Sequence, residues 1–97
     1  MANILTNMNP FSIDKNPTDI LKELAQRTRT LRKEHKMSQS ELAQRANVSL
    51  GSYKRFESSG HISLDSLLKI AFILGKLGDF ETVFQSNKNK DLEKLFK

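Results

Sequence analysis

The chain has 97 residues, a length that allows one domain with a core of modest size. It contains no cysteine, which excludes disulfides, thiolate metal sites and cysteine nucleophiles. Because no apolar run approaches the length of a membrane span and the N-terminus has no signal pattern, we expect a soluble cytoplasmic protein.

The formal net charge of +5 is concentrated in one segment. Residues 22–55 hold nine Lys and Arg against three Asp and Glu, whereas the rest of the chain is close to balance. Such a segment is expected of a face that displaces counterions from nucleic-acid phosphates. A basic, solvated helix surface is the alternative interpretation.

Residues 1–16 are rich in Asn and show no sustained period, which predicts an extended, flexible arm. A first helix is expected to begin at Asn16, with Pro17 at its first position and Asp19 in its first turn. Thr18 is the other candidate cap.

The inner face of this first helix is predicted from spacings of three and four residues. Its expected members are Leu21, Leu24, Thr28, Leu31 and His35. His35, at the end of the face, is expected to be a capping or part-buried residue and not a metal ligand. Five cations are expected to lie largely outside this face: Arg27, Arg29, Arg32, Lys33 and Lys36.

Residues 38–60 are predicted to form two short helices joined by a tight turn. Ser38 and Glu41 have the spacing of a capping box at the start of the first of these helices, whose buried side is Leu42, Ala43 and Ala46. Asn47 tolerates the left-handed conformation that a sharp turn requires.

The second short helix has an apolar side and a basic side. Ser49 is its expected N-cap, and Val48 is placed to contact Tyr53 as a hydrophobic staple. Tyr53 and Phe56 face inward, so the helical period turns the opposite side toward solvent, namely Gly51, Lys54, Arg55 and Ser58. A small, positive face of this kind suits the DNA major groove.

This segment resembles the helix-turn-helix of the Cro and phage-repressor (Xre) family. The matching positions are Gln39, Ala43 and Phe56-Glu57. At two further positions the residue differs from the usual one: Asn47 stands where the family has Gly, and Tyr53 where it has Ile or Val. The resemblance extends from about residue 19 to residue 85. It implies an all-α fold, a compact bundle of about five helices resembling lambda repressor.

The resemblance also implies roles at the DNA. Gln39 is expected to bind a phosphate. Ser49 and Ser52 are expected to do the same; the alternative role of Ser49 is that of a helix cap alone. Leu50 and Gly51 stand where relatives carry base-reading side chains, and Lys54 and Arg55 are expected to donate hydrogen bonds to bases.

The rest of the chain is predicted to support the motif. An apolar helix that belongs to the core and ends at Gly75 is predicted after the motif. Its apolar face consists of Leu64, Leu67, Leu68, Ala71 and Leu74, and is widened by Ile70, Phe72 and Ile73. Gly78-Asp79 is expected to cap a short helix whose Phe80, Val83 and Phe84 complete the core, form a dimer seam, or do both. Residues 86–97 are expected to be a polar linker and a C-terminal segment with Leu92, Leu95 and Phe96 on one side.

These features together predict a DNA-binding domain over residues 17–85. The expected function is a sequence-specific transcriptional regulator, a repressor that binds a palindromic site in double-stranded DNA as a homodimer. HipB-type antitoxins are similar small members of the family, so an antitoxin that also binds a toxin is an alternative. A protein-interaction module is another. No catalytic residue, metal site, cofactor or small-molecule substrate is expected, and an enzyme is not predicted.

Overall fold

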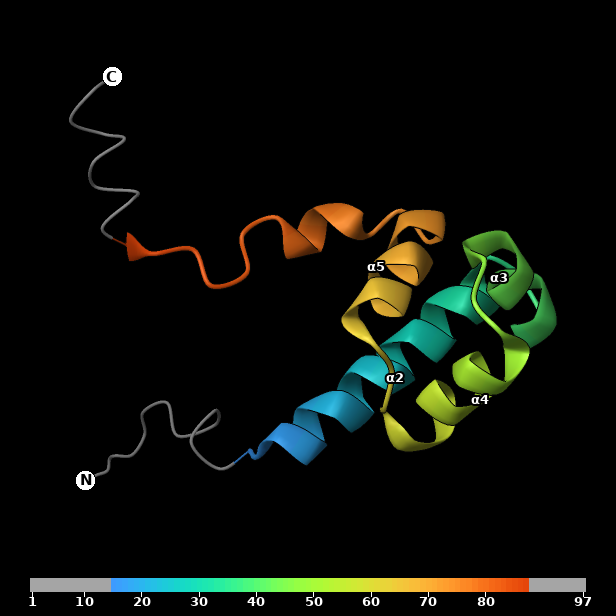
Figure 1. Ribbon diagram of the computed structural model, residues 1–97, viewed down its shortest axis with the longest axis horizontal. Helices are drawn as coiled ribbons and strands as arrows, with labels where there is room; N and C mark the ends of the chain where they lie inside the picture. Colours follow the sequence, from blue (N-terminus) through green and yellow to red (C-terminus); the bar gives the residue numbers. More distant parts are fainter. Residues whose placement is uncertain (1–14, 88–97) are drawn as a thin grey trace, which may run out of the picture.

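The computed structural model describes residues 15–87. Residues 1–14 of the predicted arm (1–16) and residues 88–97 of the predicted C-terminal segment (86–97) lie outside this range. The described part is all-α, as predicted, and contains no strand. Its elements are α2 (Pro17–Glu34), α3 (Gln39–Ala46), α4 (Leu50–Ser59), α5 (Leu64–Ile73) and a short 3-10 helix, η1 (Leu77–Phe80) (Figure 1).

A reciprocal pair of hydrogen bonds fixes the start of α2. The Asn16 side chain accepts from the Asp19 amide at 2.9 Å, and the Asp19 carboxylate accepts from the Asn16 amide at 3.2 Å. Pro17 occupies the first helical position, where its missing N–H has no helical partner to lose. Asn16, rather than Thr18, is therefore the cap.

The inner face of α2 differs from the prediction at Ala25 and Arg32. Ala25 was not among the expected members of this face, but it is only 2% exposed. Arg32 was expected at the surface, but it is buried together with Ala25 and Thr28 because it meets an acidic partner from α4. His35 caps the C-terminal end of α2, one of its two expected roles; it is exposed there, and its Nδ1 contacts the Leu31 carbonyl at 2.8 Å.

The turn between α3 and α4 forms as predicted. Ser38 and Glu41 make the expected capping box, with distances of 2.9 and 3.0 Å. Asn47 adopts the left-handed conformation at φ 58°, and the Val48 amide then reaches back to the Ala43 carbonyl at 2.9 Å. The turn thus satisfies carbonyls at the end of α3 and redirects the chain into α4.

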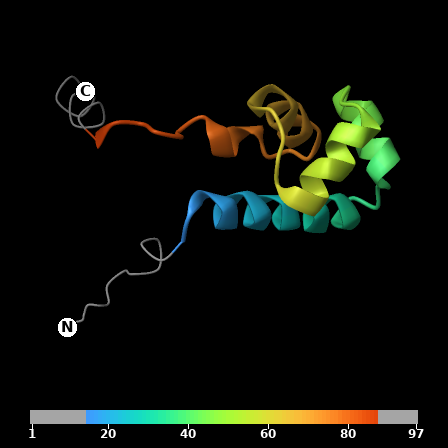
Figure 2. The same cartoon turned by 60° about the horizontal axis from the view of Figure 1, so that its bottom comes forward.

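The core lies where α4 packs on α2 and α3 packs on α5. Figure 2 shows α4 crossing the C-terminal half of α2, with the N-terminal end of α2 extending beyond α4. Tyr53, Phe56, Leu42 and Ile70 are the largest fully buried side chains of the core. The Tyr53 and Phe56 rings meet edge to face with centroids 6.2 Å apart, a favourable aromatic geometry.

Helix α5 is less buried than its composition predicts. Leu67, Ile70, Ala71 and Leu74 are in the core, but Leu64 and Phe72 are each 66% exposed. Within residues 15–87, α5 packs on α3 and η1 and borders α2 across an apolar hollow, which leaves part of its circumference uncovered. Gly75 follows with φ 73°, as expected for the residue after a helix end.

The segment after α5 departs furthest from expectation. The short helix begins at Leu77, before the predicted Gly78-Asp79 cap, and it is a single 3-10 turn. Phe80 packs against the core, whereas Val83 and Phe84 lie in a turn and are exposed. No helix within residues 15–87 is both long and apolar enough to cross a membrane.

Candidate nucleic-acid interface

One side of α4 is pinned to the core and the other side is open. Tyr53 and Phe56 are fully buried, so the 100° step per residue points Lys54 and Arg55 away from the core. Both cations are exposed, and neither forms a hydrogen bond or ion pair with another residue of 15–87 through its side chain. The predicted outward face is therefore free to meet a partner.

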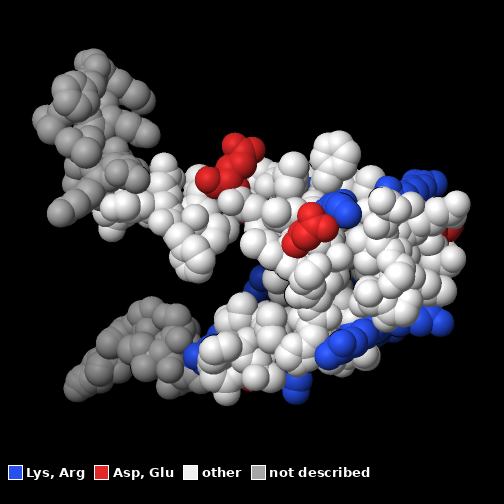
Figure 3. Space-filling view, viewed as in Figure 1, with Lys and Arg blue, Asp and Glu red and all other residues white. Residues whose placement is uncertain are grey.

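The outward face of α4 leaves open space at the N-terminal end of the helix. A side-chain carbon added at Gly51 would meet no atom within 4 Å, which shows open space in front of this turn. Leu50 is 37% exposed beside it. Figure 3 shows Lys and Arg side chains gathered along the edge of the molecule that carries α4.

Ser49 and Ser52 form hydrogen bonds with each other. The Ser49 Oγ accepts from the Ser52 amide at 3.1 Å and donates to the Ser52 Oγ at 2.8 Å. Ser49 is therefore the N-cap of α4, which was one of its two expected roles. Both serines are exposed at the N-terminal end of α4, next to Leu50 and Gly51.

Gln39, the other residue expected to bind phosphate, opens α3 and is half-buried. Its Nε2 donates to the Glu57 carboxylate at 2.9 Å. The side chain is thus held against α4, with one N–H and the amide oxygen not used by this bond.

Glu57 is the centre of a buried polar network that the sequence analysis did not identify as part of the site. It accepts from Arg32 Nε at 2.8 Å and from Arg32 Nη2 at 3.2 Å, while Arg32 Nη1 donates to the Met37 carbonyl at 2.9 Å. The Tyr53 hydroxyl also donates to Glu57. The network therefore joins α2, α3 and α4 through one carboxylate.

Protonation equilibria reflect this network. Burial by itself raises the pKa of Glu57, but the hydrogen bonds from Arg32, Tyr53 and Gln39 outweigh burial and leave the pKa below its ordinary value. The hydrogen bond to Glu57 raises the pKa of Arg32 against the opposing effect of burial. Burial, then the contact with Glu57, raises the pKa of Tyr53 well above its ordinary value. At neutral pH the network is a carboxylate with a guanidinium and two neutral donors.

A signal for this network was present in the sequence. Glu57 is an acid that directly follows the inward Phe56 in a helix whose other charged residues are Lys54 and Arg55. An acid at that position, turned partly toward the core, requires a cationic or hydrogen-bonding partner. The identity of the partner depends on how α2 crosses α4, which local sequence does not reveal.

Two surface hollows flank the outward face of α4. One, of about 530 Å³, lies on the side of α2 and α3 and is lined by Arg29, Arg32, Ser38, Gln39, Lys54, Glu57 and Ser58. The other, of about 350 Å³, lies on the side of α5 and is lined by Ser52, Arg55, His61, Ile62, Ser63 and Ser66. The structure therefore brings the predicted DNA-binding residues together around one helix and its two edges.

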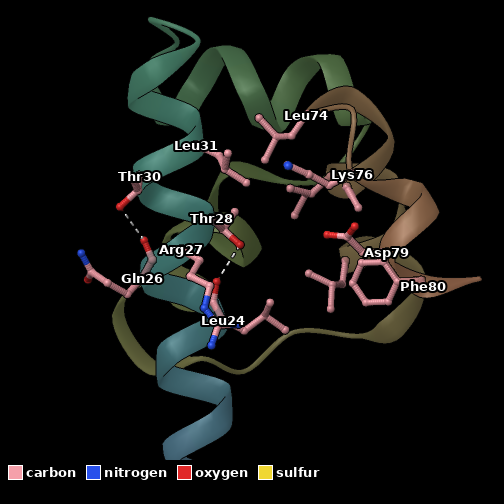
Figure 4. A pocket seen from close by; sticks show the side chains of 13 residues that line it. Leu24, Gln26, Arg27, Thr28, Thr30, Leu31, Leu74, Lys76, Asp79 and Phe80 are labelled. Carbon is pink, nitrogen blue, oxygen red and sulfur yellow. Dashed lines mark hydrogen bonds between the residues drawn. The ribbon is translucent and has the colours of Figure 1, made fainter. Parts of the chain in front are cut away.

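A third hollow, of about 590 Å³, is apolar and lies between α2 on one side and α5 with η1 on the other (Figure 4). Leu24, Leu31, Leu74 and Phe80 contribute to its walls. The Thr28 hydroxyl on its α2 wall donates to the Leu24 carbonyl at 2.8 Å, so its polar hydrogen is already used.

Nothing in the described part of the chain suggests metal chemistry. Residues 15–87 contain no group of three or more His, Asp or Glu side chains placed to hold a metal ion.

Comparison with models of known protein families matches residues 29–77 to the helix-turn-helix family. Comparison with curated proteins and with solved structures gave no match. The matched residues cover half of the chain and include the end of α2, all of α3, α4 and α5, and every residue predicted to contact DNA. The chain therefore belongs to the helix-turn-helix family of DNA-binding proteins, of the Cro and phage-repressor type.

Proposed function

We propose that this protein is a sequence-specific transcriptional regulator that represses by occupying a palindromic operator as a dimer. The observation that carries the proposal is the free outward face of α4. Lys54 and Arg55 are exposed without partners in residues 15–87, on a helix anchored by two fully buried aromatic rings. A rigid helix that presents unpaired cations suits the major groove, where guanine offers two acceptors to Arg or Lys.

Within this proposal the residues divide by task. Arg55 and Lys54 donate to base edges, Leu50 contacts a thymine methyl group, and Gly51 lets the backbone come close to the bases. Gln39 at the start of α3, together with Ser49 and Ser52, contacts phosphates and sets the register of α4 in the groove. Few side chains reach the bases, so DNA shape supplies part of the specificity.

The dimer follows from the reach of one helix, because α4 is ten residues long and reads only a few base pairs. Two copies whose recognition helices lie about 34 Å apart meet successive major grooves of a palindrome. Exposed apolar side chains offer surface for such an association, with Leu64 and Phe72 each 66% exposed on α5.

Selection of bound sequences from a random pool of duplex DNA tests the proposal. A consensus with two-fold symmetry and half-sites about 10 base pairs apart is the expected result. An asymmetric consensus would reject the palindrome, and recovery of no enriched sequence would reject sequence-specific binding.

An antitoxin that controls its own operon is a second candidate, favoured by the apolar turn after η1. Phe84 is fully exposed and Val83 is 52% exposed, in a region not needed for the DNA face. We expect an antitoxin to relieve growth arrest caused by the product of the adjacent gene, and Phe84→Ser to abolish relief but keep operator binding. An adjacent gene product without toxicity would exclude this candidate.

A protein-interaction module without DNA binding is the least supported candidate. An interface core for protein is usually depleted in Lys and enriched in aromatic side chains. The outward face of α4 instead carries Gly51, Lys54, Arg55 and Ser58, and its two aromatic rings are buried.

A further inference from the structure

The hollow between α2, α3 and α4 has a surplus of positive charge. Arg29 and Lys54 line it from two different helices, and neither side chain bonds to another residue of 15–87. Arg32 and Glu57 also line it, but these two form an ion pair whose charges cancel. Two uncompensated cations therefore border one concave surface.

The wall of this hollow is held rigidly. Glu57 accepts from Arg32, Tyr53 and Gln39, so its carboxylate is engaged by interior donors and is not available to Arg29 or Lys54. The same contacts fix the Gln39 amide at the rim, with one N–H not used by the bond to Glu57. Ser38 and Ser58 add hydroxyl groups to the lining.

We propose that this hollow receives a phosphate of the DNA backbone and that Arg29 of α2 is one of its ligands. The inference rests on the proposed function and extends the DNA interface from the helix-turn-helix onto α2. Two cations and an amide donor on a concave wall match the charge and acceptor oxygens of a phosphodiester. Lys54 borders both this hollow and the outward face of α4, so a phosphate held here lies beside the strand whose bases α4 reads.

The matched control is Arg27, on the same helix. Two residues along a helix are about 200° apart, so Arg27 and Arg29 point to different sides of α2. Arg27 lines the apolar hollow instead and makes an exposed ion pair with Glu23 at 3.3 Å. Arg27→Ala and Arg29→Ala remove the same charge from the same element at nearly the same position.

The experiment measures the affinity of the full chain for its selected operator and for an unrelated duplex, over a range of salt concentrations. We expect Arg29→Ala to weaken binding to both duplexes by the same factor and to reduce the slope of log K against log salt by about 1. Arg27→Ala is expected to leave the slope unchanged. Arg29→Lys, which keeps the charge, should recover most of the slope.

The outcomes separate this inference from the function on which it rests. If wild-type protein binds no duplex, both proposals are overturned. If wild-type protein binds DNA but Arg29→Ala and Arg27→Ala have equal slopes, only the role of Arg29 is overturned. Arg29 is exposed and unpaired in residues 15–87, so unfolding curves that match those of wild type are expected for its variants.

Discussion

Arg32 links the interior of the domain to the helix that carries the proposed DNA face. Its guanidinium group can be buried because it donates three hydrogen bonds of 3.2 Å or less, two to the Glu57 carboxylate and one to the Met37 carbonyl. A buried ion pair adds little to the free energy of unfolding compared with two apolar side chains in its place. Removal of one partner, however, leaves the other charge buried without a counter-charge, which is costly. The pair therefore fixes how α2 crosses α4 more than it raises stability.

We expect Arg32→Ala to lower the free energy of unfolding by about 3–5 kcal/mol, because Glu57 would remain buried without its cation. Urea unfolding followed by circular dichroism measures this change. Arg27→Ala breaks an exposed pair on the same helix and should cost less than about 1 kcal/mol. Equal losses in the two variants would show that Arg32 is not specially placed.

The ionisation of Glu57 makes stability depend on pH. The pKa of Glu57 is below the ordinary value of a glutamate in the folded protein, so its contribution to stability is fully present above that ordinary value. The contribution is lost as the pH falls through the lowered, folded-state pKa. Glu57→Gln should therefore be less stable than wild type at pH 7, and the difference should shrink by pH 3.

Unfolding free energies of wild type and Glu57→Gln at the two pH values test this linkage. Glu41 also has a lowered pKa, caused first by the Ser38 amide hydrogen bond, but it is present in both proteins and cancels in the comparison. A difference that stays constant from pH 7 to pH 3 would contradict the proposed role of the Glu57 charge.

At the scale of the elements, the helix ends follow local rules. Asn16, Ser38, Ser49 and Ser63 each accept a hydrogen bond from an amide of the first turn. Asn47 takes the left-handed turn. These features are readable from the sequence because each depends on residues at most a few positions apart.

What the sequence did not reveal depends on distant packing. Arg32 is buried because of a residue 25 positions away, and Gln39 is held by one 18 positions away. Leu64 and Phe72 are exposed because a small bundle has too few helices to cover α5. Composition alone indicated burial on most sides, but it does not specify how many neighbours a helix has.

Two glycines give opposite predictions for one substitution. Gly60 ends α4 at φ 87°, and a side-chain carbon there would lie 2.8 Å from the Leu21 backbone. We expect Gly60→Ala to cost at least about 1–2 kcal/mol of stability, because the left-handed conformation and the close approach both disfavour it. Gly51 lies in the first turn of α4 with open space around it, so Gly51→Ala should gain up to about 1 kcal/mol.

Thermal unfolding of the two alanine variants checks both expectations in one experiment. Gly60→Ala should melt below wild type and Gly51→Ala above it. A Gly60→Ala variant that melts at or above the wild-type temperature would contradict the close approach of Gly60 to α2, and a Gly51→Ala variant that melts below wild type would contradict the open space at Gly51.

At the scale of the whole molecule, charge and shape support the same DNA face. The cations of α4 and the neighbouring Arg29 gather around two hollows at the edges of one helix, while the apolar hollow lies between α2, α5 and η1. The proposed DNA face and the apolar hollow are therefore separate surfaces of the domain. The all-α fold and the helix-turn-helix were predictable from periodicity and caps, whereas this division of the surface required the packing.

The most direct test of the account is the affinity of Arg55→Ala for the selected operator and for a scrambled duplex of equal length, compared with Arg27→Ala. We expect Arg55→Ala to lose about 1–3 kcal/mol of binding free energy on the operator and to relax the preference at one base position. On the scrambled duplex we expect only the small loss that follows from removing one charge. Equal losses for the two variants on both duplexes would contradict the claim that the outward face of α4 reads DNA bases.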